Sequence, residues 1–164
     1  MAFSDALAAV ALAVSVFSAW VSYKAHRETT DFGERTARLS FERERSEFLV
    51  RIDRSRKYFE RTLHRINELL IEFEGQPEKV RSMLKGEIER LESDREYLKG
   101  CLRQAWALWE ETYEMSQAGL AHHKPRHLSL IEEDESYASD ALARADKAEE
   151  ALHLAHSIAN PAIG

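Results

Sequence analysis

Hydrophobic residues follow two different patterns along the chain. From Ala6 to Tyr23 no residue is charged, and apolar side chains point all round the helix that this stretch predicts. From about Glu34 onward, apolar residues recur at alternating spacings of three and four, the period of helices that pack along one face. The first pattern is typical of a membrane-spanning helix and the second of a helical bundle. The chain is therefore predicted to be all-α.

Residues 6–23 have the length of a short transmembrane helix. Eighteen helical residues extend about 27 Å at ~1.5 Å each, close to the ~30 Å hydrocarbon layer. Trp20 and Tyr23 stand where an interfacial aromatic belt would lie. The basic residues that follow are Lys24, His26 and Arg27. We expect residues 1–27 to form a single-pass anchor with a basic flank, its N-terminus outside and its C-terminal side in the cytoplasm by the positive-inside rule.

Other interpretations of this segment are weaker. A signal peptide would begin with basic residues, whereas this chain begins Met-Ala-Phe-Ser-Asp. A helix lying in the membrane plane would need a basic polar face, which residues 6–23 lack. A buried core helix of a soluble protein is the main alternative, because apolar runs shorter than about twenty residues are ambiguous.

A row of small residues lies along one face of the predicted anchor. Its members are Ala8, Ala11, Ser15, Ser18 and Ser22, at spacings of three and four. Small residues allow two helices to approach closely in a membrane, so self-association through this face is a hypothesis. Ordinary use of small residues in a short anchor is the alternative.

A coiled-coil-like bundle of three helices is predicted at residues 35–159. Residues 28–34 form a hinge or bend, since threonine and aspartate favour helix caps and Gly33 disfavours a helix interior. The helices span about 35–74, 78–120 and 129–159, and residues 160–164 form a frayed tail. Gly75-Gln76-Pro77 reverses the chain after the first, so the first two form an antiparallel hairpin. Pro125 interrupts the second, and Ser129 with Glu132 forms a capping box for the third.

The core positions follow from the heptad spacing. In the first helix they are Phe41, Phe48, Ile52, Ser55, Phe59, Thr62, Ile66, Leu69 and Phe73. In the second they are Val80, Leu84, Leu91, Leu98, Cys101, Ala105, Leu108 and Met115, while Glu87 and Asp94 on the same line mark imperfect or exposed layers. In the third they are Ile131, Ala138, Ala141, Leu142, Ala145, Ala148, Leu152 and Ala155. The third helix is mostly alanine, so it can pack closely against its neighbours.

Charge is distributed unevenly, although 23 basic and 29 acidic residues leave a formal net charge of only −6. Residues 51–65 hold six basic side chains against two acidic ones, and residues 128–150 hold eight acidic against two basic ones. We expect the acidic third helix to lie beside the basic first helix. Nucleic acid is not expected on the basic stretch, because Phe59 is needed in the core and acids are interspersed.

Residues with catalytic or ligand-binding potential do not form a recognisable motif. His122, His123 and His127 cluster in the loop before the third helix, and His153 and His156 lie three residues apart, a spacing that can place two imidazoles on one helix face. Nothing fixes a third ligand, so solvated histidines are expected. The lone Cys101 falls on a core position, which favours an inert buried thiol. No catalytic, metal or cofactor site and no small-molecule substrate are expected, and the chain is predicted not to be an enzyme.

Three aromatic residues share one face of the second helix: Trp106, Trp109 and Tyr113. Their bulk suits the alanine-rich third helix, which favours burial in the core. The alternative is a docking surface, where tryptophan and tyrosine are common anchors.

We therefore expect a membrane-anchored structural or adaptor protein that binds the bilayer through residues 6–23 and self-associates or binds a protein partner. A soluble or peripheral helical regulator that oligomerises is the alternative. The order of an N-terminal anchor and a coiled coil is similar to that of phage inner-membrane spanin subunits, in layout and not in residues. Lys24 and Arg27 disfavour that resemblance, since they place the coil in the cytoplasm.

Overall fold

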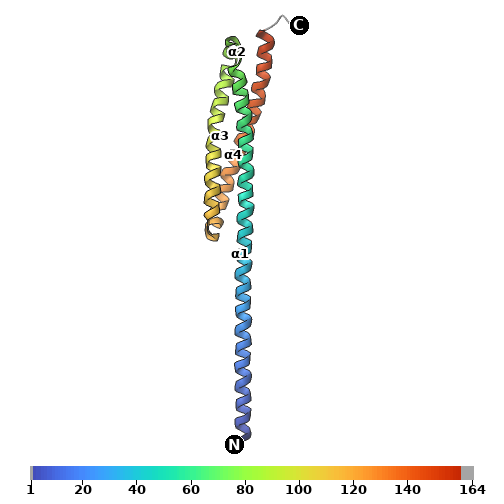
Figure 1. Ribbon diagram of the computed structural model, residues 1–164, viewed down its shortest axis with the longest axis vertical. Helices are drawn as coiled ribbons and strands as arrows, with labels where there is room; N and C mark the ends of the chain where they lie inside the picture. The colour runs from blue at the N-terminus through green and yellow to red at the C-terminus, as the bar shows by residue number, and fades with distance from the viewer. Residues whose placement is uncertain (1, 160–164) are drawn as a thin grey trace. The chain divides into compact units, whose positions relative to one another are not determined.

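The computed structural model describes the backbone of residues 2–159 and the side chains of residues 14–159. Four helices account for it: α1 (Ala2–Glu74), α2 (Glu78–Met83), α3 (Lys85–Glu114) and α4 (Gln117–Ala159). The chain divides into two compact units, Met1–Glu44 and Arg45–Gly164. In the second unit the C-terminal part of α1, α3 and α4 lie side by side (Figure 1). The predicted all-α fold with a helical bundle is confirmed.

The predicted membrane span is not supported by the structure. Within the part of the chain that is described, no helix holds a stretch both long enough and apolar enough to cross a membrane. Residues 6–13 of the predicted span lie outside the described side chains. Over the remainder, residues 14–23, the chain is helical and every side chain is exposed.

The predicted break at residues 28–34 is absent from the secondary structure, because α1 continues through it. The hydroxyls of Thr29 and Thr30 do not cap a new helix. They donate hydrogen bonds back to the carbonyls of Ala25 and His26, four residues earlier (2.8 and 2.9 Å). This bonding pattern satisfies a threonine hydroxyl inside a helix. The compact second unit begins at Arg45, ten residues after the predicted start of the bundle.

The first chain reversal lies where Gly75-Gln76-Pro77 predicts it. The Gly75 amide donates to the Ile71 carbonyl (3.2 Å), and Pro77 takes the cap position before α2. Leu84 separates α2 from α3 by one residue while its amide still bonds to the Val80 carbonyl. α2 and α3 together therefore take the place of the predicted second helix of the hairpin.

The second reversal is earlier than predicted, at Met115 and Ser116. The Ser116 hydroxyl accepts the Gly119 amide (3.2 Å), and the Ser116 carbonyl accepts the Leu120 amide (2.9 Å). Ser116 thus caps α4, which runs through Pro125 and past Ser129. The predicted interruption at Pro125 and the capping box at Ser129 are wrong. Burial of Leu120, His127 and Ile131 on one side of α4 holds the helix through the proline.

The core of the second unit follows the heptad positions read from the sequence. Spacings of three and four are unbroken in α1 from Phe48 to Phe73 and in α3 from Leu91 to Thr112. Ser55 and Thr62 are fully buried at such positions. The Thr62 hydroxyl donates to the Tyr58 carbonyl, and the Ser55 hydroxyl accepts a bond from the Arg51 guanidinium at 2.7 Å. From α4 the buried residues include five alanines, at positions 138, 141, 145, 148 and 155.

One charged residue is buried among these apolar side chains. The Asp94 side chain on α3 is only 5% exposed, and Arg144 on α4 reaches it with Nε and a terminal nitrogen, both at 2.8 Å. The Tyr137 hydroxyl donates to the same carboxylate at 2.7 Å. Burial and this bond raise the pKa of Tyr137 to about 12. These bonds satisfy the Asp94 carboxylate and tie α3 to α4.

We predict that Arg144→Leu destabilises the bundle by about 3–5 kcal/mol, because it leaves the buried Asp94 carboxylate without its counter-charge. The double variant D94L/R144L should be more stable than R144L alone, since no unpaired buried charge remains. Urea unfolding followed by circular dichroism measures both free energies. A double variant less stable than R144L would contradict this account of the pair.

Candidate functional site

The aromatic face of α3 lies on the surface of the bundle, not in its core. Trp106 is 47% exposed and Tyr113 is 60% exposed, while Trp109 is half-buried. The expectation that these rings pack against the alanines of α4 is therefore wrong. In this part of α3 the core positions are Ala105, Leu108 and Thr112. Each aromatic residue is the next one along the chain and is therefore turned away from the core.

The three rings contact one another in a row, and two arginines of α1 lie over the first and the last ring. The Arg56 guanidinium lies over the Trp106 ring at 4.3 Å, and the Trp106 and Trp109 rings meet edge to face at 6.4 Å. Trp109 stacks on Tyr113 at 5.7 Å, and Arg45 lies over Tyr113 at 5.9 Å. We call these five residues the aromatic ladder. Its arginines join α1 to α3 along their shared edge.

Acidic side chains border the ladder on its α3 side. A shallow hollow of about 610 Å³ is lined by Ala107, Trp109, Glu110, Glu111, Tyr113 and Glu114. The three glutamates are exposed. Exposed aromatic rings beside carboxylates suit a lysine or arginine side chain, which gains both cation–π and ionic contacts.

The expected pairing of the basic and acidic helices is present in the bundle. Arg51 on α1 makes a two-pronged ion pair with Glu135 on α4, and the Ser55 hydroxyl donates to the same carboxylate at 2.6 Å. Arg65 pairs with Glu149 through one terminal nitrogen and one carboxylate oxygen. Both pairs join residues 84 apart in sequence, so α1 and α4 run parallel here in a constant register. The bond from Arg51 lowers the pKa of Glu135.

The three histidines expected in a loop lie within α4 instead. His127 is buried, and its ring stacks on Phe48 of α1 at 6.5 Å and on His123 at 5.8 Å. Its Nδ1 atom has no hydrogen-bond partner among the described residues. His153 is exposed and His156 is half-buried. No group of three or more side chains placed to hold a metal ion occurs in the region that the structure covers.

The lone cysteine occupies the expected core position. Burial and the neighbouring Asp134 raise the pKa of the Cys101 thiol to about 12. A thiol with so high a pKa carries almost no thiolate at neutral pH, so it is a poor nucleophile.

Comparison with known proteins gives no relative. No family model matches the chain, and neither a curated protein nor a solved structure is significantly similar to it.

Sequence reasoning found the three aromatic residues but missed Arg45 and Arg56, which complete the ladder. Arg56 follows the core position Ser55, and Arg45 lies one heptad before Ile52. Which rings the two arginines reach depends on the register between α1 and α3, which the helical period alone does not give.

We predict that acid weakens the bundle through His127. Burial lowers the pKa of His127 in the folded state, with His123 and Arg126 acting in the same direction and Glu111 opposing them. The unfolded chain therefore binds the proton first, and stability falls as the pH drops below the ordinary value of 6.5. Urea midpoints measured above and below pH 6.5 test this.

The matched variants are His127→Leu and the exposed His153→Leu. His127→Leu should flatten the pH dependence of the midpoint, whereas His153→Leu should leave it unchanged, since His153 is solvated in both states. An unchanged profile in His127→Leu would assign the acid response to another group.

Proposed function

We propose that this chain is a membrane-anchored helical adaptor, without catalytic activity, whose bundle docks a basic segment of another protein on the aromatic ladder. The observation that carries this proposal is that large apolar side chains are left uncovered in both units. In α1 they include Val14, Val16, Phe17, Trp20 and Val21, and on α3 they include Trp106 and Tyr113. Exposed apolar groups on this scale need a covering surface outside the chain.

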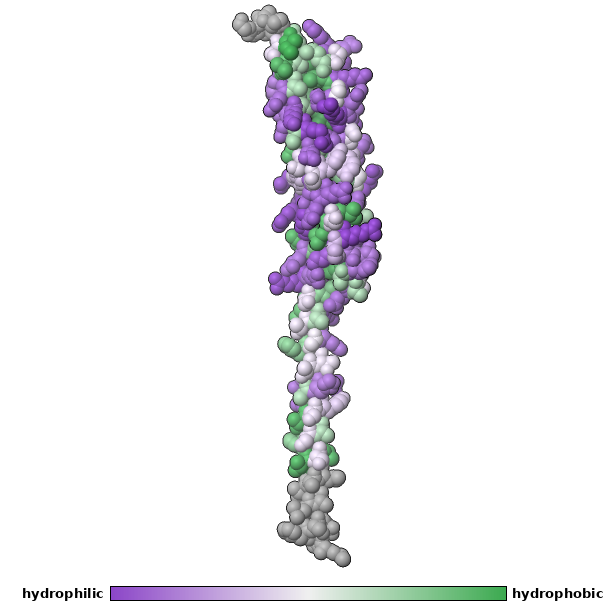
Figure 2. Space-filling view, turned by 180° about the vertical axis from the view of Figure 1, so that it is seen from behind, coloured by the Kyte–Doolittle hydropathy of each residue, from purple (hydrophilic) through white to green (hydrophobic). Residues whose placement is uncertain are grey.

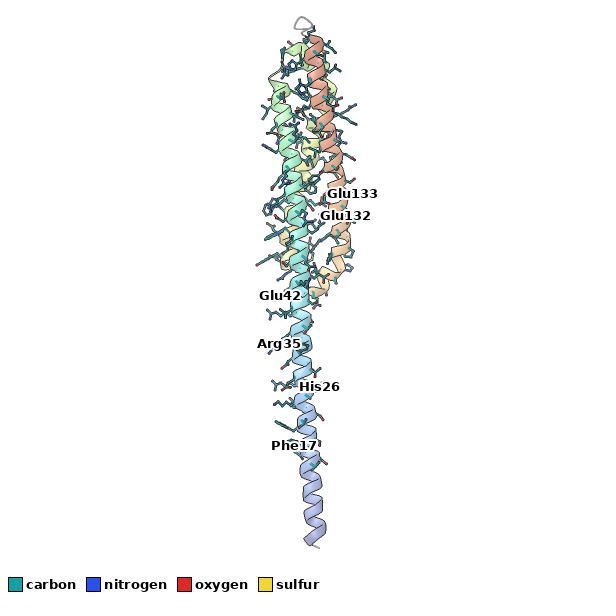
Figure 3. The ribbon with its side chains drawn as sticks, turned by 90° about the vertical axis from the view of Figure 1, so that its right-hand side faces the viewer. Phe17, His26, Arg35, Glu42, Glu132 and Glu133 are labelled. Atoms are coloured by element: carbon teal, nitrogen blue, oxygen red, sulfur yellow. The ribbon has the colours of Figure 1, made fainter. Side chains whose placement is uncertain are left out.

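For the first unit, the proposed cover is a bilayer. Phe17, labelled in Figure 3, is 64% exposed and Val16 is 63% exposed. Hydrophobic side chains gather near the lower end of the described part of α1 in Figure 2. The charge-free sequence of residues 6–23 and the basic flank after it favour lipid over a protein partner. Because basic residues next to a membrane helix favour the cytoplasmic side, Lys24 and Arg27 also support a cytoplasmic location for the bundle in this proposal.

For the second unit, the proposed partner carries lysine or arginine. Glu110, Glu111 and Glu114 make no ion pair with any described residue, so their charge is available to a ligand. Asp53 at 2.6 Å and Glu60 at 3.6 Å both pair with Arg56, which reduces the repulsion that this arginine would exert on an incoming cation. The ladder is also held from both helices, so little side-chain freedom is lost on binding.

The anchor is tested by membrane fractionation of the full-length chain. Wild type should pellet with membranes and resist carbonate extraction. Val14→Arg should cost about 2.5–3.5 kcal/mol of insertion free energy and shift the chain toward the soluble fraction. Ile71→Arg, at a position 69% exposed in the bundle, should leave the distribution unchanged. Recovery of wild type in the soluble fraction would contradict the anchor.

The docking face is tested with a labelled helical peptide of lysine and alanine, followed by fluorescence anisotropy. Trp109→Ala and the triple variant E110Q/E111Q/E114Q should each weaken binding about tenfold, since each removes part of the cation site. The control E74Q/E78Q/E92Q makes the same change in net charge at exposed glutamates away from the ladder and should bind like wild type. Equal loss in the control would show that only overall charge attracts the peptide.

A further inference from the structure

Two arginines in the basic stretch of α1, residues 51–65, take no part in the ion pairs among the described residues of the bundle. Within residues 51–65, Arg51 and Arg65 pair with α4, while Arg56 and Lys57 pair with Asp53. Arg54 and Arg61 make no ion pair or hydrogen bond with any described residue, and both are exposed. Arg54 acts only at longer range, where its charge helps to lower the pKa of Glu135.

These two arginines border a groove where α1 faces α4. The groove encloses about 570 Å³ and is lined by Val50, Asp53, Arg54, Lys57, Tyr58, Arg61 and Glu135. Its two carboxylates are already neutralised, Asp53 by Lys57 at 2.7 Å and Glu135 by Arg51 at 2.6 Å. The uncompensated charge of the groove is therefore that of Arg54 and Arg61, which we call the basic stripe.

The chain also carries the complementary surface. Glu133 and Asp140 on α4 are exposed and make no ion pair with any described residue, and we call them the acidic stripe. Glu133 is labelled on α4 in Figure 3. Both stripes consist of two like charges seven residues apart on a continuous helix, which separates the charges by about 10.5 Å along the axis. The two stripes therefore match in spacing and are opposite in charge.

We propose that the basic stripe of one copy of this chain docks on the acidic stripe of a second copy. Arginine suits this contact, because its planar fork can bind a carboxylate through two bonds, as Arg51 does within the bundle. Nucleic acid is a poorer occupant of the groove. Two carboxylates, those of Asp53 and Glu135, line the groove and would lie beside the phosphates.

Two copies can make this contact in two ways. A reciprocal twofold dimer uses both stripes of each copy, whereas a single contact leaves one stripe free on each copy and continues into rings or open chains. The formal net charge of −6 on each copy opposes association. Repulsion between whole molecules is screened beyond about 8 Å at physiological ionic strength, whereas charges in direct contact are screened much less. This proposal depends on neither the membrane anchor nor the aromatic ladder.

The test is sedimentation equilibrium of the full-length chain in a density-matched nonionic detergent, with variants that reverse one stripe at a time. R54E/R61E leaves two acidic stripes on each copy, and E133R/D140R leaves two basic ones. Each variant alone should self-associate at least about tenfold more weakly than wild type, because charges of the same sign now face each other across the contact. An equimolar mixture of the two should regain the wild-type mass distribution.

The matched control is K79E/R81E, which changes the same amount of charge at exposed positions of α2 and should behave like wild type. Circular dichroism confirms that every variant keeps its helix content. The proposal is overturned if wild type stays monomeric up to about 0.1 mM, if neither reversal weakens association, if the control weakens it equally, or if the mixture fails to recover. Association that survives both reversals would place the contact on another surface.

Discussion

The bundle depends on the small size of the residues that α4 contributes to its core. Five buried alanines face the phenylalanine, isoleucine and leucine side chains of α1, so α4 can approach its neighbours closely. Close approach brings Glu135 and Glu149 within reach of Arg51 and Arg65. Trp106 and Tyr113 lie outside the core because each follows a buried position of α3 by one residue.

The heptad spacing predicted the core better than the ends of the helices. Most apolar positions assigned to the core of α1, α3 and α4 are buried, because a period of three and four is repeated over many turns. Asp94, expected at an imperfect or exposed layer, is buried instead. The helix ends depend on one or two residues each. Pro125 lies inside α4 because the surrounding packing holds the helix, and local sequence does not contain that packing. The cap at Ser116 is a local signal, because its hydroxyl accepts the amide three residues later.

The candidate surfaces were predictable in part. The residues of the ladder on α3 and the unequal distribution of charge are visible in the sequence. The sequence does not show which basic side chains form ion pairs, because that depends on which carboxylate the folded chain places near each of them. Of two arginines only three residues apart, Arg51 is bound by Glu135 and Arg54 is not. That difference arises from the register between α1 and α4, which a helical period alone leaves open.

The equal sequence separation of the two ion pairs has a mechanical consequence. Arg51 and Arg65 lie two heptads apart on α1, and so do Glu135 and Glu149 on α4. If α4 slid along α1 by one heptad, the apolar core would repeat almost unchanged. Both arginines would lose their carboxylates, however, and Leu142 would come opposite one of them. The apolar core therefore permits several sliding positions of α4, and the paired charges select one, which makes this edge of the bundle resistant to shear.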